Sequence, residues 1–177
     1  MLSIDIKLQK LVEDLYGERR GALVAIDPRN GEILALVSKP TFDPNLFVEG
    51  IDQENWQALN ESINKPLLNR ALRGTYPPGS TYKPFMALAA LQLNKRSPTL
   101  VVNDPGYYNF GGRTFRSHEG GLGGVDMVRA IQFSSNTYFY SLGVEMGVDT
   151  IHDFMAPLGF GQITGIDLGG ELRGVLP

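Results

Sequence analysis

The first forty residues of the chain show two hydrophobic patterns of different period. Between residues 3 and 17 apolar side chains recur every three or four positions, which predicts an amphipathic helix capped by Ser3 and closed by Gly17; these side chains are Ile6, Leu8, Leu11, Val12 and Leu15. Two continuous apolar runs follow at residues 22–26 and 33–37, with Asp27-Pro28-Arg29-Asn30-Gly31 between them. Because Asn-Gly favours a tight turn, these runs predict a hairpin of two antiparallel strands.

The rest of the chain has mainly helical patterns. We expect helices near residues 52–59, 85–93, 127–133, 136–146 and 150–156, separated by glycine or polar breaks. In the second of these, Phe85, Leu88, Ala89 and Leu91 predict a buried face. Residues 106–124 are dense in glycine, so we expect a loop without strands there, either bordering an active site or lying on the surface.

Composition narrows the class of protein. At 177 residues and 42% hydrophobic, the chain can bury one core and has the length of a single domain. The net charge is −3 without a dense basic run, which argues against nucleic acid as a partner. The absence of cysteine excludes disulfides and cysteine catalysis, and no apolar stretch reaches the ~18 residues that a membrane span needs. The run Gly120-Gly121-Leu122-Gly123-Gly124 lacks the lysine and the preceding strand of a phosphate-binding loop, so we expect no nucleotide site.

The most informative stretch is Ser80-Thr81-Tyr82-Lys83, which follows Tyr76-Pro77-Pro78-Gly79. A serine hydroxyl becomes nucleophilic when a neighbouring group removes its proton, and Lys83 lies one helical turn away. With Pro84 in the first turn, we expect Ser80 at the N-terminus of a buried helix, where free backbone N–H groups favour an oxyanion. The segment Ser62-Ile63-Asn64-Lys65 has the same spacing but lacks the preceding glycine and the following helix. The pattern at Ser80 therefore indicates acyl transfer.

A second motif, Ser134-Ser135-Asn136, precedes the run Thr137-Tyr138-Phe139-Tyr140. A hydroxyl can relay a proton to a leaving group, and an amide can hold both the lysine and a substrate carbonyl. Ser134 and Asn136 would fill these two roles. The alternative is a plain helix cap, since serine and asparagine both favour that position.

Together with Gly159-Phe160-Gly161 and Gly165-Ile166-Asp167-Leu168, these motifs resemble the transpeptidase domain of class B penicillin-binding proteins, above all the penicillin-binding protein 2 group that serves cell elongation. The resemblance runs from about Ser3 to the end of the chain. It implies an α+β fold of the penicillin-binding protein and serine β-lactamase type, in which the hairpin belongs to a central antiparallel sheet. The family's Lys-Thr-Gly motif occurs nowhere in the 177 residues.

We therefore expect residues 1–177 to be one truncated transpeptidase domain: a mostly helical part plus the hairpin, without membrane anchor, pedestal or C-terminal strands. The resemblance implies a location on the bacterial cytoplasmic (inner) membrane with the catalytic domain facing the periplasm, whereas this piece should be soluble. Without the Lys-Thr-Gly strand, which supplies the second oxyanion donor, we expect it to have little or no activity alone, since one lost donor costs about 100- to 1,000-fold.

The resemblance implies cross-linking of peptidoglycan stem peptides that end in D-alanyl-D-alanine. Ser80 would attack the penultimate D-alanine carbonyl with Lys83 as base, Ser134 would pass the proton to the leaving group, and Asn136 would orient Lys83 and the substrate amide. β-Lactam antibiotics would acylate Ser80 as substrate mimics, and the membrane proteins of the elongation complex would be partners. No cofactor is implied. Some relatives carry a zinc ion near Asp104 and His118 with a cysteine that aligns with Ser135, but a two-ligand remnant binds weakly, so we expect no metal.

Two alternatives remain open. A serine β-lactamase or a β-lactam-sensing domain would use the same serine and lysine, but it would need a residue that activates water for deacylation, and no glutamate lies in a motif for that role. From a different class, a non-catalytic scaffold of the elongation complex would use the Ser80 and Lys83 pair as a structural hydrogen bond, and Ser80 would then be inert.

Overall fold

The computed structural model describes residues 2–117 and 120–177 and divides the chain into two compact units. The first unit comprises Met1–Thr75 and Gly165–Leu172, and the second comprises Tyr76–Thr164 and Arg173–Pro177. Within the described residues, none of the helices combines the length and hydrophobicity needed to cross a bilayer.

The first unit begins with the predicted helix. Helix α1 (Ile6–Tyr16) ends at Gly17, whose φ of 53° suits glycine. The prediction of Ser3 as its cap is wrong: the side chain of Asp5 accepts hydrogen bonds from the backbone N–H groups of Lys7 and Leu8, at 2.9 and 3.1 Å. Ser3 instead donates to the carbonyl oxygen of Ile33, at 2.7 Å. Serine and aspartate both cap helices, so the sequence alone does not choose between Ser3 and Asp5. The hydrogen bond from Ser3 to the hairpin leaves the cap to Asp5.

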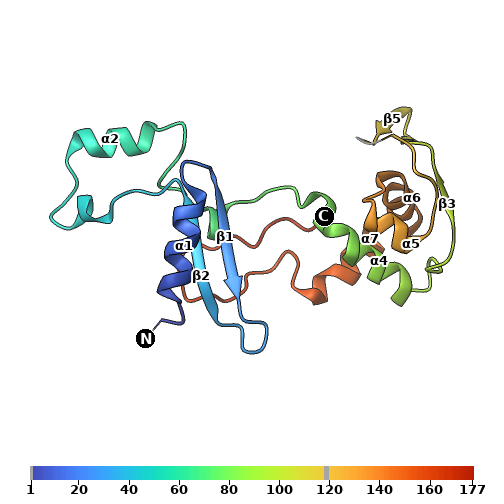
Figure 1. Ribbon diagram of the computed structural model, residues 1–177, viewed down its shortest axis with the longest axis horizontal. Helices are drawn as coiled ribbons and strands as arrows, with labels where there is room; N and C mark the ends of the chain where they lie inside the picture. Colours follow the sequence, from blue (N-terminus) through green and yellow to red (C-terminus); the bar gives the residue numbers. More distant parts are fainter. Residues whose placement is uncertain (1, 118–119) are drawn as a thin grey trace. The chain divides into compact units, whose positions relative to one another are not determined.

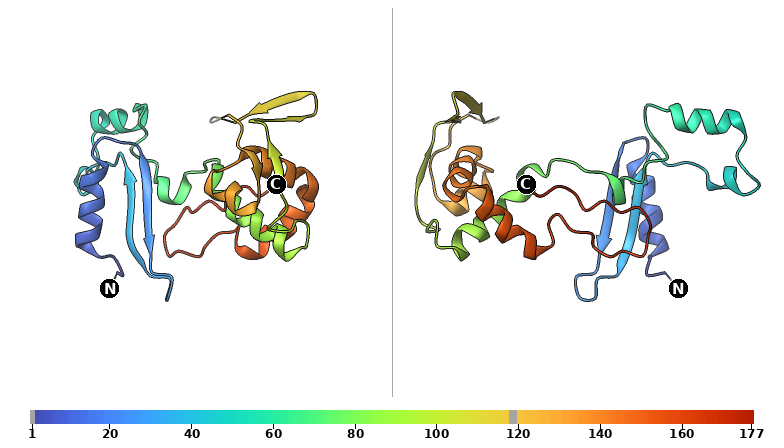
Figure 2. Two further views of the ribbon diagram at one scale, coloured as in Figure 1. Left: turned by 45° about the vertical axis from the view of Figure 1, so that its right-hand side comes forward. Right: turned by 180° about the vertical axis from the view of Figure 1, so that it is seen from behind.

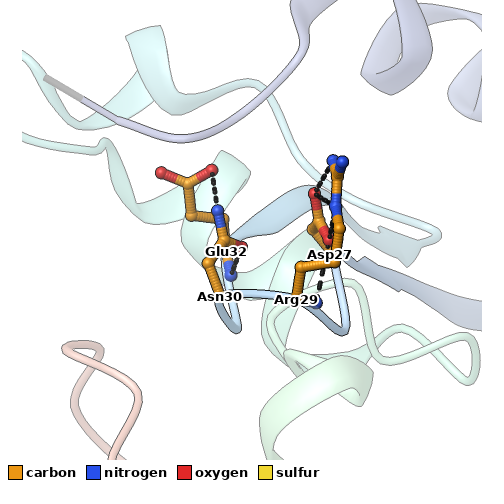
Figure 3. Close-up of polar contacts among 4 residues, drawn as sticks. All are labelled: Asp27, Arg29, Asn30 and Glu32. Carbon is orange, nitrogen blue, oxygen red and sulfur yellow. Dashed lines mark hydrogen bonds and ion pairs between the residues drawn. The ribbon is translucent and has the colours of Figure 1, made fainter.

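The predicted hairpin is confirmed, with β1 (Gly21–Ile26) antiparallel to β2 (Ile33–Lys39). Gly31 in the turn has a φ of 79°, a conformation that favours glycine. Around it, Arg29 forms an ion pair with Asp27 at 2.6 Å, and the side chain of Asn30 donates to Glu32 at 2.9 Å (Figure 3). Short polar contacts between neighbouring residues thus fix the turn.

Helix α1 lies along the hairpin and covers the edge of β2 (Figure 1). The side-chain amide of Gln9 donates to the carbonyl oxygen of Leu36 at 3.0 Å and accepts from its N–H at 2.9 Å. The Gln9 side chain therefore forms with this edge the pair of hydrogen bonds that the backbone of a neighbouring strand would form.

The remaining elements of the first unit are short. They are a 3-10 turn η1 (Pro44–Phe47), helix α2 (Gln53–Glu61), which Asp52 caps, and helix α3 (Arg70–Arg73). Arg70 is buried and donates to the carbonyl oxygen of Asn64 at 2.6 Å. The segment Gly165–Leu172 joins this unit through a backbone hydrogen bond from Leu172 to Leu72, at 3.0 Å.

The second unit is built on helices around a small core. A 3-10 turn η2 (Gly79–Tyr82) leads into α4 (Lys83–Gln92), and later come α5 (Met127–Gln132), α6 (Asn136–Met146), α7 (Val148–Met155) and the 3-10 turn η3 (Ala156–Leu158). The predicted helices are thus confirmed, within a few residues at their ends. Tyr138, Leu142 and Met155 are fully buried in the core of this second unit.

The predicted buried face of α4 is largely wrong. Of its four expected members only Ala89 is buried, whereas Phe85, Leu88 and Leu91 are 39–47% exposed. The core is instead lined from α4 by Met86, Ala87, Ala89 and Ala90. Small alanine side chains permit close packing of helices, and α4 is apolar on all sides, so its pattern alone does not select the buried face.

The prediction of a strandless loop at residues 106–124 is also wrong. Strands β4 (Tyr107–Phe110) and β5 (Arg113–Arg116) form a hairpin, and β6 (Gly123–Val125) pairs with β3 (Val102–Asp104). The turn of the hairpin is Gly111-Gly112, with φ values of 58° and 76°. Figure 2 shows this hairpin, in yellow, standing out from the helices of the same unit.

Candidate active site

Ser80 lies in the η2 turn directly before α4, so it is placed at the N-terminal end of a helical segment, as predicted. Gly79 enters the turn with a φ of 57°, and the hydroxyl of Thr81 donates to the carbonyl oxygen of Pro78 at 2.6 Å. The backbone N–H of Lys83 in turn donates to the carbonyl oxygen of Ser80. Ser80 is exposed, which leaves its hydroxyl accessible to a substrate.

The side chain of Lys83 reaches across to the Ser134-Ser135-Asn136 segment. Its Nζ atom donates to the carbonyl oxygen of Ser134 at 2.6 Å, to Ser134 Oγ at 2.9 Å and to Asn136 Oδ1 at 2.7 Å. An ammonium group carries three protons, and these three acceptors use all of them. The two predicted motifs therefore meet at the lysine.

Ser134 connects the lysine to the serine. Its hydroxyl accepts from Lys83 and donates to Ser80 Oγ at 2.8 Å, which gives a continuous hydrogen-bonded chain from Lys83 through Ser134 to Ser80. Within the described residues, no hydrogen bond joins Lys83 directly to Ser80. Ser134 holds this position with a φ of 54°, in the left-handed region that few side chains adopt.

The environment of Lys83 favours the neutral amine over the ammonium form. Burial lowers the pKa of Lys83 below its ordinary value, and the negative charge of Asp104 partly opposes this change. The Lys83 ammonium also lies 5.6 Å from the centre of the Phe139 ring. A partly buried lysine with a lowered pKa is suited to act as a base near neutral pH.

Asp104 also belongs to this cluster, although from the sequence it was considered only as one of two remnant ligands of a metal that we did not expect. It is 1% exposed and accepts hydrogen bonds from Ser135 Oγ at 2.5 Å and from the backbone N–H of Gly106 at 2.8 Å. Burial raises the pKa of Asp104, but the hydrogen bonds from Ser135, Gly106 and Thr137 and the charge of Lys83 outweigh it, so the pKa lies below its ordinary value. The bond to Gly106 is an Asx turn, and the sequence Asp-Pro-Gly is typical of such turns.

A pocket of about 130 Å³ opens beside these groups. Its walls are formed by Ser80, Asp104, Ser117, Gly120, Leu122, Phe133, Ser134, Ser135 and Asn136. Ser80, Ser134 and Asn136 therefore face one cavity within the second unit.

A metal ion does not fit the described residues at this place. In residues 2–117 and 120–177, no three His, Cys, Asp or Glu side chains gather in a group that could hold one. Both oxygens of Asp104 already accept hydrogen bonds, and the Ser135 hydroxyl that donates to it is not one of zinc's usual ligands. His118, the other residue considered, lies outside the described part of the chain.

Comparison with known proteins gives the family. The family model of the penicillin binding protein transpeptidase domain matches residues 21–177. The peptidoglycan D,D-transpeptidase MrdA of Acinetobacter baumannii is 46% identical over 99% of this chain, which spans 27% of that protein.

Two solved structures are similar as well. The Pseudomonas aeruginosa PBP2, solved in complex with WCK 5153, has a TM-score of 0.93 and 47% identity over 99% of this chain and 41% of its own. A Helicobacter pylori PBP2, solved in a complex with MreC, has a TM-score of 0.92 and 35% identity over 98% of this chain and 33% of its own. The predicted α+β transpeptidase fold is confirmed, and the chain belongs to the penicillin-binding protein transpeptidase family, within the group of PBP2 and MrdA proteins.

Proposed function

We propose that the protein cross-links peptidoglycan by acyl transfer from stem peptides that end in D-alanyl-D-alanine, with Ser80 as nucleophile. One observation carries this proposal: the hydrogen-bonded chain in which Ser134 bridges Lys83 and Ser80. The names of the similar proteins support the same reaction, although this chain covers about a quarter of the length of the curated relative.

The hydrogen-bonded chain suggests how the nucleophile is formed. While Lys83 is an ammonium, its three protons are donated to Ser134 and Asn136, and Ser134 can only donate onward to Ser80. Loss of one proton gives the amine a lone pair that accepts from Ser134, and Ser134 then accepts from Ser80. Deprotonation of Lys83 thereby reverses the chain. As the Ser80 hydroxyl attacks, its proton passes to Ser134 while the Ser134 proton passes to the Lys83 amine.

The remaining steps balance in atoms and charge. Ser80 Oγ bonds to the carbonyl carbon of the penultimate D-alanine, and collapse of the oxyanion breaks the amide bond to the terminal D-alanine. The leaving nitrogen takes the proton from Lys83 by way of Ser134. The amino group of a second stem peptide then attacks the ester carbonyl, and the C–O bond to Ser80 breaks. A proton of that amino group passes by way of Lys83 and Ser134 to Ser80. Asn136 holds Lys83 through one amide oxygen and can offer its NH₂ group to the substrate.

The Ser80 backbone N–H is the oxyanion donor that this chain offers at the start of the helical segment. The 177 residues contain no Lys-Thr-Gly, which the family uses for a second donor. We therefore expect the 177-residue chain to react about 100- to 1,000-fold more slowly than a protein with both donors.

The proposal extends to partners and location. By similarity to the H. pylori PBP2 solved with MreC, we propose that the whole protein binds a partner of that kind. From the resemblance to the penicillin-binding protein 2 group, we further propose that it assembles with elongation proteins at the outer face of the bacterial cytoplasmic membrane, with its catalytic domain in the periplasm. β-Lactams would acylate Ser80 because they present a strained amide in place of the D-alanyl-D-alanine bond.

The test uses the full-length gene product and a synthetic stem peptide that ends in D-alanyl-D-alanine. We expect release of D-alanine, loss of that release in Ser80→Ala, and no change in Ser62→Ala, which alters the serine of the other Ser-x-x-Lys match. The lifetime of the benzylpenicillin adduct separates the alternatives: a transpeptidase keeps it for many turnover times, and a β-lactamase hydrolyses it. Absence of both D-alanine release and adduct would refute the enzyme and favour the scaffold.

A further inference from the structure

The carboxylate of Asp104 is deeply buried beside the proposed active site and is held there by hydrogen bonds. Asp104 ends strand β3, is 1% exposed, and accepts from Ser135 Oγ and from the N–H of Gly106. Within the described residues, no salt bridge within 4.0 Å pairs it with a cation. A buried charge is costly unless hydrogen bonds compensate it, so these donors are held firmly in place.

Ser135 stands between the two residues that contact Lys83. Its backbone N–H donates to the carbonyl oxygen of Ala130 at 2.9 Å, which fixes the main chain at the end of α5. Its hydroxyl donates to Asp104, which leaves its lone pairs free to accept from the N–H of Tyr138 at 3.1 Å and so to cap α6. Ser135 is therefore held by both its main chain and its side chain.

This arrangement constrains its neighbours. Ser134 must keep a left-handed φ of 54° for its oxygen atoms to reach Lys83 and Ser80. That conformation costs about 1–2 kcal/mol for a residue with a side chain, so the surrounding contacts must maintain it. Asn136 begins α6, and the Ser135 cap sets where that helix starts.

We propose that Asp104 is a positioning residue for acyl transfer: its buried carboxylate anchors Ser135 and thereby holds Ser134 and Asn136 around Lys83. Asp104 touches no reacting atom in this scheme and acts through Ser135. This inference rests on the proposed function, since it assigns a role within the same site. The sequence separation is 31 residues, and the anchor is formed between strand β3 and the start of α6.

The test measures acylation by benzylpenicillin in the full-length protein, by rapid quenching and intact mass. Varying the benzylpenicillin concentration separates the acylation rate constant from the dissociation constant of the first complex. The variants are Asp104→Ala, Ser135→Ala, their double substitution and Asp104→Asn. Ser141→Ala is the matched control, because Ser141 also forms a hydrogen bond within α6, to Tyr138 at 2.8 Å, but has no contact with Lys83. Thermal unfolding of each variant reports on folding.

We expect Asp104→Ala and Ser135→Ala each to lower the acylation rate constant by about 10- to 100-fold, the usual cost of misplacing reacting groups, with little change in the dissociation constant. The double variant should be no slower than the slower single variant, because both remove the same contact. Asp104→Asn should recover most of the rate, since an amide can keep a hydrogen bond to Ser135. Ser141→Ala should acylate like the wild type.

Three results would overturn the proposal. The first is a folded Asp104→Ala protein that acylates at the wild-type rate. The second is a double variant whose loss is the product of the two single losses, because the residues would then act independently. The third is an Asp104→Asn protein as slow as Asp104→Ala, which would assign the effect to charge. If the wild-type protein forms no adduct at all, the proposed function fails and this inference fails with it.

Discussion

Removal of the Ser134 hydroxyl is the perturbation that probes the proposed proton path most closely. In Ser134→Ala the chain from Lys83 to Ser80 loses its middle member, whereas two of the three acceptors of the Lys83 ammonium remain: the main-chain oxygen of residue 134 and Asn136 Oδ1. The lysine should therefore keep its position while its connection to the nucleophile is broken. The substitution thus isolates proton transfer from the placement of the base.

The magnitude follows from that separation. A positioned acid or base contributes about 100- to 10,000-fold to a rate. Because a water molecule can enter the space of the lost hydroxyl and bridge the gap in part, we expect the lower portion of that range, a fall of about 100- to 1,000-fold in the acylation rate constant. This corresponds to about 3–4 kcal/mol of transition-state stabilisation.

The conformation of residue 134 supplies a matched control. At a φ of 54°, alanine bears the strain of the left-handed region and glycine does not. Ser134→Gly removes the same hydroxyl without that strain, so both variants should lose the same factor in rate, measured by quenched-flow mass spectrometry with benzylpenicillin. Wild-type rates in both would show that the proton does not pass through Ser134. A slow alanine variant with a fast glycine variant would assign the effect to the backbone.

Three further predictions concern the base, its amide partner and two glycines. Because burial lowers the pKa of Lys83 and the reaction needs the neutral amine, the acylation rate constant should rise with pH and level off with a midpoint below 10.5; a rate that falls as the solution becomes alkaline would exclude Lys83 as base. Asn136→Ala removes one acceptor of that ammonium and should slow acylation by about 10-fold or more, and full activity would show that the amide is dispensable. Gly143→Ala should raise the free energy of unfolding in urea by about 1 kcal/mol, since the new methyl group meets nothing described within 4 Å and alanine favours helix. Gly106→Ala should lower it by about 2–4 kcal/mol, because φ is +88° and the methyl group would lie 2.6 Å from the carbonyl carbon of Gly120; equal stability of the two variants would contradict both expectations.

Local signals predicted the elements that local chemistry determines. The hairpin at Asn30-Gly31 and the helix that has Pro84 in its first turn each depend on residues within a few positions of one another. The Gly111-Gly112 hairpin was missed even though its signal is local: two consecutive glycines between short strands are typical of a tight turn, and both have a positive φ here. The density of surrounding glycines obscured that pattern.

Long-range contacts account for the rest of what the sequence did not predict. The pairing of β3 with β6 and the hydrogen bond from Ser135 to Asp104 join residues about twenty or more positions apart. The spacing of apolar residues along the chain does not predict such contacts. For the site, the types and spacing of Ser80, Lys83, Ser134 and Asn136 were enough to propose which residues carry the chemistry. Only the geometry shows that a hydroxyl lies between the lysine and the nucleophile, because that depends on how the chain folds back after α5.

The central claim is that Ser80 is an acylating serine activated by Lys83 through Ser134. The most direct measurement is the intact mass of the full-length protein after incubation with benzylpenicillin, with peptide mapping of the modified residue, for the wild type, Ser80→Ala and Ser62→Ala. The account predicts one added benzylpenicillin mass, mapped to Ser80, present in the wild type and in Ser62→Ala and absent from Ser80→Ala. An adduct that persists in Ser80→Ala, or the absence of any adduct in the wild type, would contradict it.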